Sequence, residues 1–235
     1  MKKFIVENDF WNLFPKAKIG VVVCKGIDNT IKNEEKFKKM ILEAEKKALE
    51  CLKNPEFSSN EVIRIWRETF RKFKTKKGAR SSIESLLKRV YKGNHLNNIN
   101  PLVDIYNSIS LKYLLPCGGE DIDKISGDII LTKAVGDEFF VALGEDKNEP
   151  PYEGELIYKD NNGAICRCLN WRESVRTMLT ENTKNAVLCM ELVDENRGKE
   201  FEIALEELSK KVMENLGGAC KVSILDINNK EIILD

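Results

Sequence analysis

Two polar residues lie where the surrounding sequence pattern is apolar. Glu191 belongs to the run AVLCMELV at 186–193, and a carboxylate in such a run lies either at a sheet edge or in a functional site. Asn107 falls in the middle of an expected helix, where asparagine lowers helix propensity. Either a functional contact or a structural hydrogen bond must compensate for that cost. An amide and a carboxylate can position a substrate and a water molecule, so both residues are candidates for a site.

The thiols suggest packing rather than metal binding. Seven cysteines are scattered along the chain without a CxxC pair: Cys24, Cys51, Cys117, Cys166, Cys168, Cys189 and Cys220. A disulfide framework is not expected from this odd number, and a reducing cytoplasm is the simplest compartment. Cys166 and Cys168 are expected to share one strand face, but zinc needs two more ligands and the single histidine, His95, is distant in sequence. We expect no metal and no other cofactor.

The sequence contains no generic catalytic motif. It has no phosphate-binding loop, nucleophile elbow or HExxH. No apolar run approaches the roughly 20 residues that a membrane-spanning helix needs. The N-terminal stretch MKKFIVENDFW is interrupted by polar residues too early for a signal peptide or an anchor. We therefore expect a globular, cytoplasmic protein with no membrane partner.

The net charge of zero hides an uneven distribution of charge. Residues 62–92 contain eleven Lys or Arg against two acids, whereas residues 119–160 contain twelve acids against four lysines. The run RKFKTKKGAR at 71–80 lies at the junction of two expected helices. Such a run is either a solvated surface or a contact for a polyanion such as tRNA. The candidate tRNA-binding residues are Arg71, Lys72, Lys74, Lys76, Lys77 and Arg80.

Apolar residues at helical spacing, bounded by capping and breaking residues, predict five helices. Their expected ranges are 33–52, 58–78 with a Ser58–Glu61 capping box, 81–93 with a Ser81–Glu84 capping box, 100–116 with Asn100 as the N-cap, and 199–216.

Short β-type runs predict eight strands. Their expected ranges are 19–24, 128–132, 138–142, 155–159, 164–168, 186–193, 219–226 and 229–234. We see no repeat and no long linker. The pattern predicts one domain over residues 1–235, of mixed α/β (α+β) class, with an N-terminal helical portion and a C-terminal helix plus strands.

Residues 98–128, NINPLVDIYNSISLKYLLPCGGEDIDKISGD, resemble the editing domain (the B3/B4 region) of the phenylalanyl-tRNA synthetase β subunit. The alignment has no gap from Val103 to Asp128, and eleven positions match. ILTKAVGDEFFVALG at 130–144 and TENTKNAVL at 180–188 are also similar, so the resemblance covers about residues 80–193. It implies a stand-alone B3/B4 editing-domain-like fold that acts on charged tRNA.

The sequence departs from the family where the amino-acid pocket is expected. Tyr106, Gly118 and Glu120 replace a threonine, a histidine and a phenylalanine, and NWRES at 170–174 replaces a glycine-rich loop. The family's glutamate falls at Cys189, and Glu191 lies two residues further on the same strand face. The resemblance implies catalytic roles for Asn107 and Glu191, and substrate binding by Tyr106, Gly118, Gly119, Glu120, Asn170, Trp171, Arg172 and Glu173.

Domains of this kind hydrolyse the ester between a wrong amino acid and the tRNA 3′ end. That ester is already activated, so positioned polar groups and a water molecule are sufficient. Glu120 and Glu173 indicate a polar or cationic amino acid, unless Glu120 pairs with Lys124 and Glu173 with Arg172 or Arg176. Three functions stay open: a trans-acting aminoacyl-tRNA deacylase, a non-catalytic tRNA- or RNA-binding module, and a small-molecule enzyme or binder.

Overall fold

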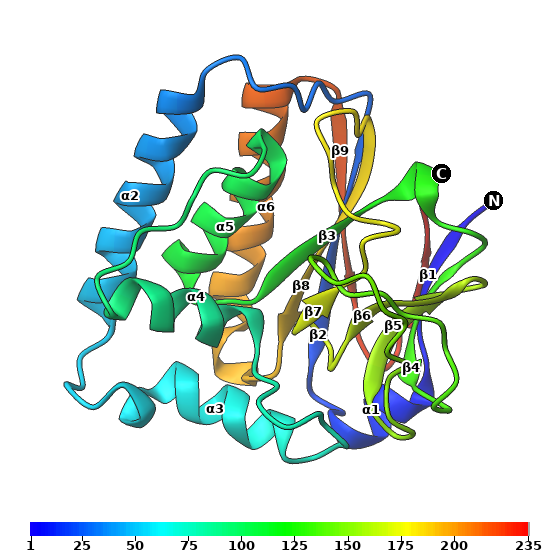
Figure 1. The fold of residues 1–235 in the computed structure, drawn as a ribbon. Coiled ribbons are helices and arrows are strands. Elements are labelled where there is room, and N and C mark those ends of the chain that lie inside the picture. The colour runs from blue at the N-terminus through cyan, green and yellow to red at the C-terminus, as the bar shows by residue number, and fades with distance from the viewer. Residues whose placement is uncertain (235) are drawn as a thin grey trace.

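The computed structural model describes residues 1–234, which form two β-sheets and six α-helices. The helices α2, α5 and α6 lie on one side of a four-stranded sheet, and a six-stranded sheet lies on its other side (Figure 1). The predicted mixed α/β class is therefore confirmed.

The four-stranded sheet is antiparallel, and it is buried on both faces except along its last strand, which is partly exposed. Its order is β3 (Cys117–Asp121), β8 (Asn185–Leu192), β2 (Lys18–Lys25) and β9 (Ala219–Leu225). Because strand side chains alternate between faces, Leu188 and Met190 of β8 pack among the helices. Val187 and Cys189 of the same strand pack towards the six-stranded sheet. A polar residue at an odd-numbered position of β8 is thus directed between the two sheets.

The six-stranded sheet forms the second wall of that interface. Its order is β10 (Glu231–Ile233), β1 (Lys3–Val6), β4 (Ile129–Lys133), β5 (Leu156–Asp160), β6 (Gly163–Arg167) and β7 (Arg172–Glu173). The strands β1 and β4 are parallel, and the other neighbours are antiparallel. Phe4, Ile129 and Tyr158 supply apolar surface to the core between the sheets.

The helices form two groups. Helices α5 (Pro101–Tyr113) and α6 (Gly198–Leu216) cover the outer face of the four-stranded sheet, and α2 (Glu34–Cys51) packs on α5. Helices α1 (Asn8–Leu13), α3 (Glu61–Phe70) and α4 (Ser82–Tyr91) bury Trp11, Trp66 and Leu87 against the core between the sheets. Single 3-10 turns occur at Phe57–Ser59, Ile122–Lys124 and Glu195–Arg197.

The predicted start and end of the second helix are wrong. Ser58 does not cap it, because Ser58 lies in a 3-10 turn where its hydroxyl donates to Glu56. Helix α3 begins at Glu61, and it ends at Phe70 rather than near Gly78. Residues 71–80 therefore form the loop between α3 and α4. The predicted caps Ser81 and Asn100 are confirmed, since each accepts a hydrogen bond from an amide in the first turn of its helix.

The strand predictions fail in two places. Residues 138–142 form a loop with one isolated bridge, Ala142 to Ser174, because the carboxylate of Glu138 accepts hydrogen bonds from the amides of Val135 and Gly136. The CxC pair does not share a strand face, because β6 ends at Arg167 and Cys168 has a φ of 47°. The sequence pattern does not predict β1, β3 or β7; in β3, two glycines and two acids conceal the strand.

Buried amides fix the start of α5. Asn100 is 4% exposed, and its Oδ1 accepts from the amide of Val103 at 3.1 Å and from Nδ2 of Asn29 at 3.0 Å. Its own Nδ2 donates to the carbonyl oxygen of Leu179 at 3.3 Å. Asn29 in turn accepts from the amide of Leu102. This network ties α5 to the turn after β2 and to the segment before β8.

A comparison of two asparagine caps tests this network. Asn33 caps the exposed start of α2 with one hydrogen bond, from the amide of Lys36. We expect Asn33→Ala to lower the free energy of unfolding by about 1 kcal/mol or less, as for an ordinary cap. Asn100→Ala leaves buried partners unsatisfied as well, and should cost about 3 kcal/mol. Urea denaturation of both variants measures the difference, and equal costs would contradict the buried role of Asn100.

Candidate functional site

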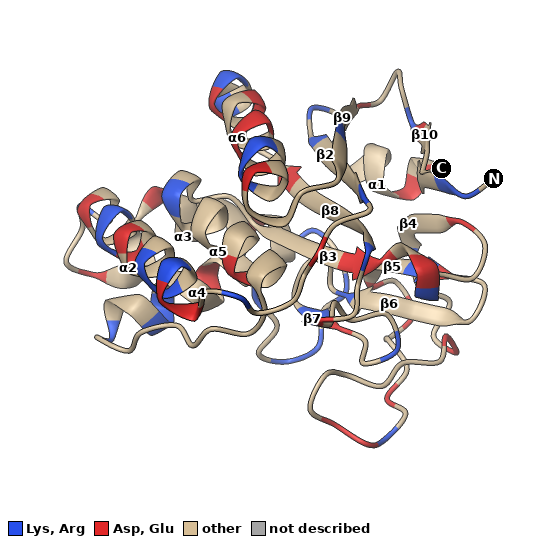
Figure 2. Cartoon of the chain, turned by 90° about the horizontal axis from the view of Figure 1, so that it is seen from above, with Lys and Arg blue, Asp and Glu red and all other residues tan. Residues whose placement is uncertain are grey.

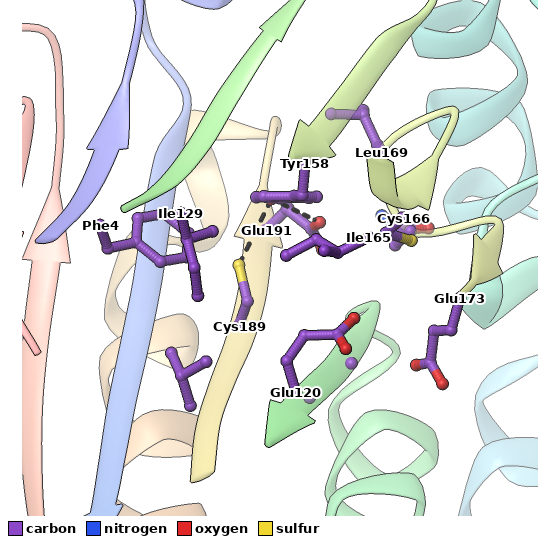
Figure 3. Close-up of a pocket in the computed structure, with 14 residues that line it drawn as sticks. Phe4, Glu120, Ile129, Tyr158, Ile165, Cys166, Leu169, Glu173, Cys189 and Glu191 are labelled. Atoms are coloured by element: carbon purple, nitrogen blue, oxygen red, sulfur yellow. Dashed lines mark hydrogen bonds between the residues drawn. The ribbon is translucent and has the colours of Figure 1, made fainter. Parts of the chain in front are cut away.

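A chamber lies between the two sheets (Figure 3). One wall comes from β3 and β8, at Gly118–Glu120 and at Val187, Cys189 and Glu191, and the other comes from Phe4, Ile129 and Tyr158 of the six-stranded sheet. The space between the protein atoms is about 440 Å³, counted with its open mouth. Most of the lining is apolar, and carboxyl groups are set into it.

A more open groove adjoins the chamber. Its lining includes Tyr106 and Asn107 of α5, and Ser82 and Ser85 from the first turn of α4. Residues 170–173 complete the groove, and Asn170 and Glu173 line the chamber as well. The two spaces therefore meet at Asn170 and Glu173.

Glu191 is the least exposed carboxylate of the chamber. It is 2% exposed, and its Oε1 accepts a hydrogen bond of 2.9 Å from the hydroxyl of Tyr158. The same hydroxyl lies 3.3 Å from Sγ of Cys189, as the dashed lines in Figure 3 mark. Burial raises the pKa of Glu191 to about 7, although Tyr158 and the nearby amide of Asn170 favour the charged form. A carboxyl with this pKa exchanges a proton near neutral pH.

Asn170 places an amide at the same space. Its Oδ1 accepts from the amide of Ser82 at 2.8 Å, which fixes the side chain against the start of α4. Its Nδ2 is buried and makes no hydrogen bond within residues 1–234, and the same is true of Oε2 of Glu191. The two groups are near enough for the amide of Asn170 to lower the pKa of Glu191, yet neither forms a hydrogen bond of ordinary geometry, and such buried groups require an explanation.

Glu120 and Glu173 add two more carboxyls, which point towards one another in Figure 3. Burial raises the pKa of Glu173 to about 7, and burial followed by the charge of Glu173 raises the pKa of Glu120 well above its usual range. Oε2 of Glu120 is buried without a hydrogen bond to the described residues. The two carboxyls are therefore held near the same space by the fold.

The ion pairs that were open as an alternative for these glutamates do not form. Arg172 pairs with Glu145 at 3.2 Å, and Arg176 pairs with Asp160 at 2.7 Å. Lys124 donates to the carbonyl oxygen of Met178. None of the three basic side chains therefore forms an ion pair with Glu120 or Glu173, although the charge of Arg176 acts to lower the pKa of Glu120.

The two adjacent glycines of β3 have different roles. A Cβ on Gly118 would meet only Oε1 of Glu173, at 3.3 Å, so its lack of a side chain leaves room on the chamber side. A Cβ on Gly119 would lie 2.5 Å from Leu188 on the opposite face. Packing explains Gly119, whereas the position of Gly118 allows Glu173 to approach the chamber.

The structure separates the two predicted catalytic residues. Glu191 lines the chamber, whereas Asn107 is half-buried in the adjoining groove with Tyr106 and Trp171. The guanidinium of Arg172 lies 5.4 Å from the centre of the Trp171 ring. Asn107 is therefore placed to contact a part of a ligand other than the part that reaches Glu191.

Tyr158 was missed by the sequence analysis. It lies in the run LIYKD, where a tyrosine at a buried strand position resembles ordinary core packing. Only the packing of the six-stranded sheet on the four-stranded sheet, with β5 facing β8, brings its hydroxyl to Glu191. No signal in the sequence connects two residues that are 33 positions apart on different sheets.

The basic loop 71–80 leads directly into α4, whose first turn lines the groove. Lys76 pairs with Glu149, and Nζ of Lys74 lies 6.0 Å from the centre of the Tyr152 ring. Arg71, Lys72 and Lys77 are exposed. Arg80 donates to the carbonyl oxygen of Gly78. Lys76 is therefore neutralised by Glu149 of the acidic segment 119–160. Arg71, Lys72 and Lys77 form no ion pair with an acid among the residues that the structure describes. By contrast, charges of both signs alternate along α2 and α6 (Figure 2).

The residues that the structure describes include no group of three His, Cys, Asp or Glu side chains placed to hold a metal ion. The single histidine, His95, contacts Glu45 of α2. Within residues 1–234, every helix is too short or too polar to cross a membrane.

The model of one protein family, described as the B3/4 domain, matches residues 65–214. The chain belongs to the B3/4 domain family. This confirms the resemblance that the sequence analysis drew from residues 80–193, and the matched range takes in the chamber residues from Gly118 to Glu191 as well as the basic loop.

One solved structure similar to this B3/4 protein is an N-terminal fragment of the phenylalanyl-tRNA synthetase β subunit from Pyrococcus horikoshii. The two share 16% sequence identity with a TM-score of 0.48, over 92% of this chain and 49% of that one. The chain thus spans about half the length of the fragment. No curated protein sequence matches the chain.

The raised pKa of Glu191 predicts how stability depends on pH. The folded protein binds this proton more tightly than the unfolded chain does, so the associated stability is present below about pH 4.5 and is lost as the pH rises through about 7. Glu191→Gln removes that loss. Its effect on the free energy of unfolding should therefore be roughly 3 kcal/mol more favourable at pH 8 than at pH 4.5.

Glu207→Gln is the matched control. The pKa of Glu207 is lowered by hydrogen bonds from Lys112 and Tyr113, which outweigh its partial burial. Its stabilising effect is lost only as the pH falls below the ordinary carboxyl pKa, so the effect of Glu207→Gln should change little between pH 8 and pH 4.5 and should not become more favourable at pH 8. Urea denaturation of both variants at the two pH values gives the comparison. A Glu191→Gln variant whose effect on the free energy of unfolding is as constant between the two pH values as that of Glu207→Gln would refute the raised pKa of Glu191.

Proposed function

We propose that this protein is a trans-acting aminoacyl-tRNA deacylase, which hydrolyses the ester between an amino acid and the 3′ end of a mischarged tRNA. The observation that carries the proposal is the pair of unsatisfied buried groups, Oε2 of Glu191 and Nδ2 of Asn170, that face one chamber. An acceptor near its pKa at neutral pH can take a proton from water, and a fixed amide can hold that water or the ester carbonyl oxygen.

The reaction needs only water as a second reactant. Glu191 accepts a proton from the water while the water oxygen forms a bond to the ester carbonyl carbon. The bond from that carbon to the 3′ oxygen of the terminal ribose then breaks, and Glu191 returns the proton to the leaving oxygen. The products are a free amino acid and an uncharged tRNA, and Glu191 ends in its starting state. The hydroxyl of Tyr158 holds the carboxylate in place on the other oxygen.

The division into chamber and groove suits a substrate of two parts. In this proposal the amino-acid side chain enters the chamber, and the terminal ribose lies in the groove near Asn107, Trp171 and Arg172. Glu120 and Glu173 form no ion pair with the described residues, so a cationic or polar side chain would stabilise their charged forms, which an aromatic one would not. Tyr106, Gly118 and Gly119 would shape the boundary between the two parts.

Hydrolysis of charged tRNAs tests the proposal. A panel of tRNAs charged with cationic, polar and aromatic amino acids is incubated with the protein, and ester loss is corrected for spontaneous hydrolysis at each pH. We expect cationic or polar esters to be cleaved faster than tyrosyl and phenylalanyl esters. The corrected rate should rise with pH and level off above about 7, as Glu191 loses its proton.

Variants separate the roles within this experiment. Glu191→Gln should lower the rate constant by roughly tenfold or more and remove the rise with pH, and Asn107→Ala should lower the rate by roughly tenfold. Glu207→Gln, on α6 outside the chamber, should leave the rate unchanged. Tight tRNA binding without loss of any ester would instead identify a binding module, and neither binding nor hydrolysis would favour a small-molecule function.

The basic loop is proposed to contact tRNA phosphates beside the groove. Replacing Lys74, Lys76 and Lys77 by glutamine should weaken tRNA binding. It should also flatten the dependence of binding on salt concentration, in proportion to the number of phosphates that the loop neutralises. Lys36→Gln, Lys38→Gln and Lys39→Gln on the exposed face of α2 form a control with the same change in charge. Equal effects of the two triple variants would show that net charge, and not the loop, determines binding.

A further inference from the structure

Two thiols face each other on the four-stranded sheet, away from the chamber. Cys24 of β2 and Cys220 of β9 are direct partners in the antiparallel register, and their Sγ atoms are 3.1 Å apart. Cys24 is completely buried, whereas Cys220 is half-buried on the edge strand of the sheet. Both pack with the apolar cluster beneath the helices, on the face opposite to the chamber. The pair is therefore separate from the proposed active site.

The backbone holds this pair in register. Gly218 comes directly before β9 and has a φ of +70°, a conformation that suits glycine. A Cβ at this position would lie 2.3 Å from the carbonyl oxygen of Lys25, so the start of β9 is packed tightly against the end of β2. Antiparallel pairing from that point places Cys220 opposite Cys24.

The two thiols are chemically unequal. The hydrogen bond with Cys24, supported by the hydroxyl of Ser209, lowers the pKa of Cys220 despite its partial burial. The same hydrogen bond, together with burial, raises the pKa of Cys24. Burial also raises the pKa values of Cys117, Cys166 and Cys189. A half-buried thiol with a lowered pKa, 3.1 Å from a buried thiol with a raised pKa, is the arrangement that thiol–disulfide exchange needs.

We propose that Cys24 and Cys220 form a reversible dithiol–disulfide site that exchanges with small-molecule disulfides of the glutathione type. The Cys220 thiolate attacks one sulfur of the disulfide, forms a mixed disulfide and releases one glutathione thiolate. Cys24 then gives up its proton and attacks the Cys220 sulfur, which releases the second glutathione. The two cysteines lose two electrons in total, and the glutathione disulfide gains them.

The bond would connect the edge strand β9 covalently to β2. It closes a loop that contains most of the chain, and long closed loops restrict the unfolded state most strongly. The oxidised protein should therefore unfold at a thermal midpoint roughly 4 °C or more above that of the reduced protein. The bond forms on the helix-facing side of the sheet, so this outcome is independent of the proposed deacylase activity.

The test titrates the full chain with mixtures of reduced and oxidised glutathione, followed by alkylation of free thiols and mass spectrometry. In the wild type we expect two of the seven thiols to be lost with the removal of two hydrogen atoms. A crosslinked peptide containing Cys24 and Cys220 should disappear on reduction. Cys51→Ser, which removes an exposed thiol, should change neither result.

Single variants distinguish exchange from simple reactivity. Cys24→Ala should leave Cys220 as a stable mixed disulfide with glutathione, because the second thiol is gone, and Cys24→Ser provides a second test if alanine perturbs the core. Cys220→Ser should abolish both the crosslink and the rise in thermal midpoint. A wild-type protein that keeps all seven thiols, or that accumulates the same mixed disulfide as Cys24→Ala, would overturn the proposal.

Discussion

The burial of carboxyl groups between two sheets is the constraint on which the candidate site depends. Glu120, Glu173 and Glu191 line a largely apolar chamber, where a charged carboxylate is costly. A flexible scaffold would let these side chains turn to solvent. The four-stranded sheet prevents this for Glu120 and Glu191, because it is covered on both faces and its strands alternate strictly between them.

The same alternation separates the protein into two functional faces. On β8, even-numbered residues such as Leu188 and Met190 anchor the helices, and odd-numbered residues such as Cys189 and Glu191 enter the chamber. A glutamate can therefore move by two residues along this strand and remain in the chamber, whereas a shift by one would direct it into the helix layer. Cys189 and Glu191, two residues apart on β8, both line the chamber and obey this rule.

The surroundings of the chamber carboxyls set their pKa values and the orientation of their oxygens. Burial raises the pKa of Glu191 towards neutrality, Tyr158 orients one of its oxygens, and the other oxygen faces the chamber with Asn170 nearby. A serine or cysteine nucleophile is not needed for an activated ester, since a positioned water molecule suffices. Loss of solvent raises the pKa values of the Cys166 and Cys189 thiols for the same reason that it raises the pKa of Glu191, because burial disfavours the charged form of each group.

The sequence by itself determined the local structure and the family. Some features depend only on residues that are neighbours in the sequence, and these were predicted correctly. They are the caps Ser81 and Asn100, the apolar periodicity of α2 and α6, and the gapless family pattern from Val103 to Asp128. Prediction from the sequence failed where residues that are distant along the chain determine whether a strand forms. Glu138 and its turn replaced an expected strand, and the glycines of β3 concealed a real one.

Only the tertiary structure decided which side chains meet. It placed Glu191 beside Tyr158 and Asn170, put Asn107 in a neighbouring groove, and engaged Arg172 and Arg176 with other acids. These contacts depend on the register and stacking of two sheets whose strands are interleaved along the chain. Local propensity carries no information about that stacking, because it results from the burial of both sheet faces at once.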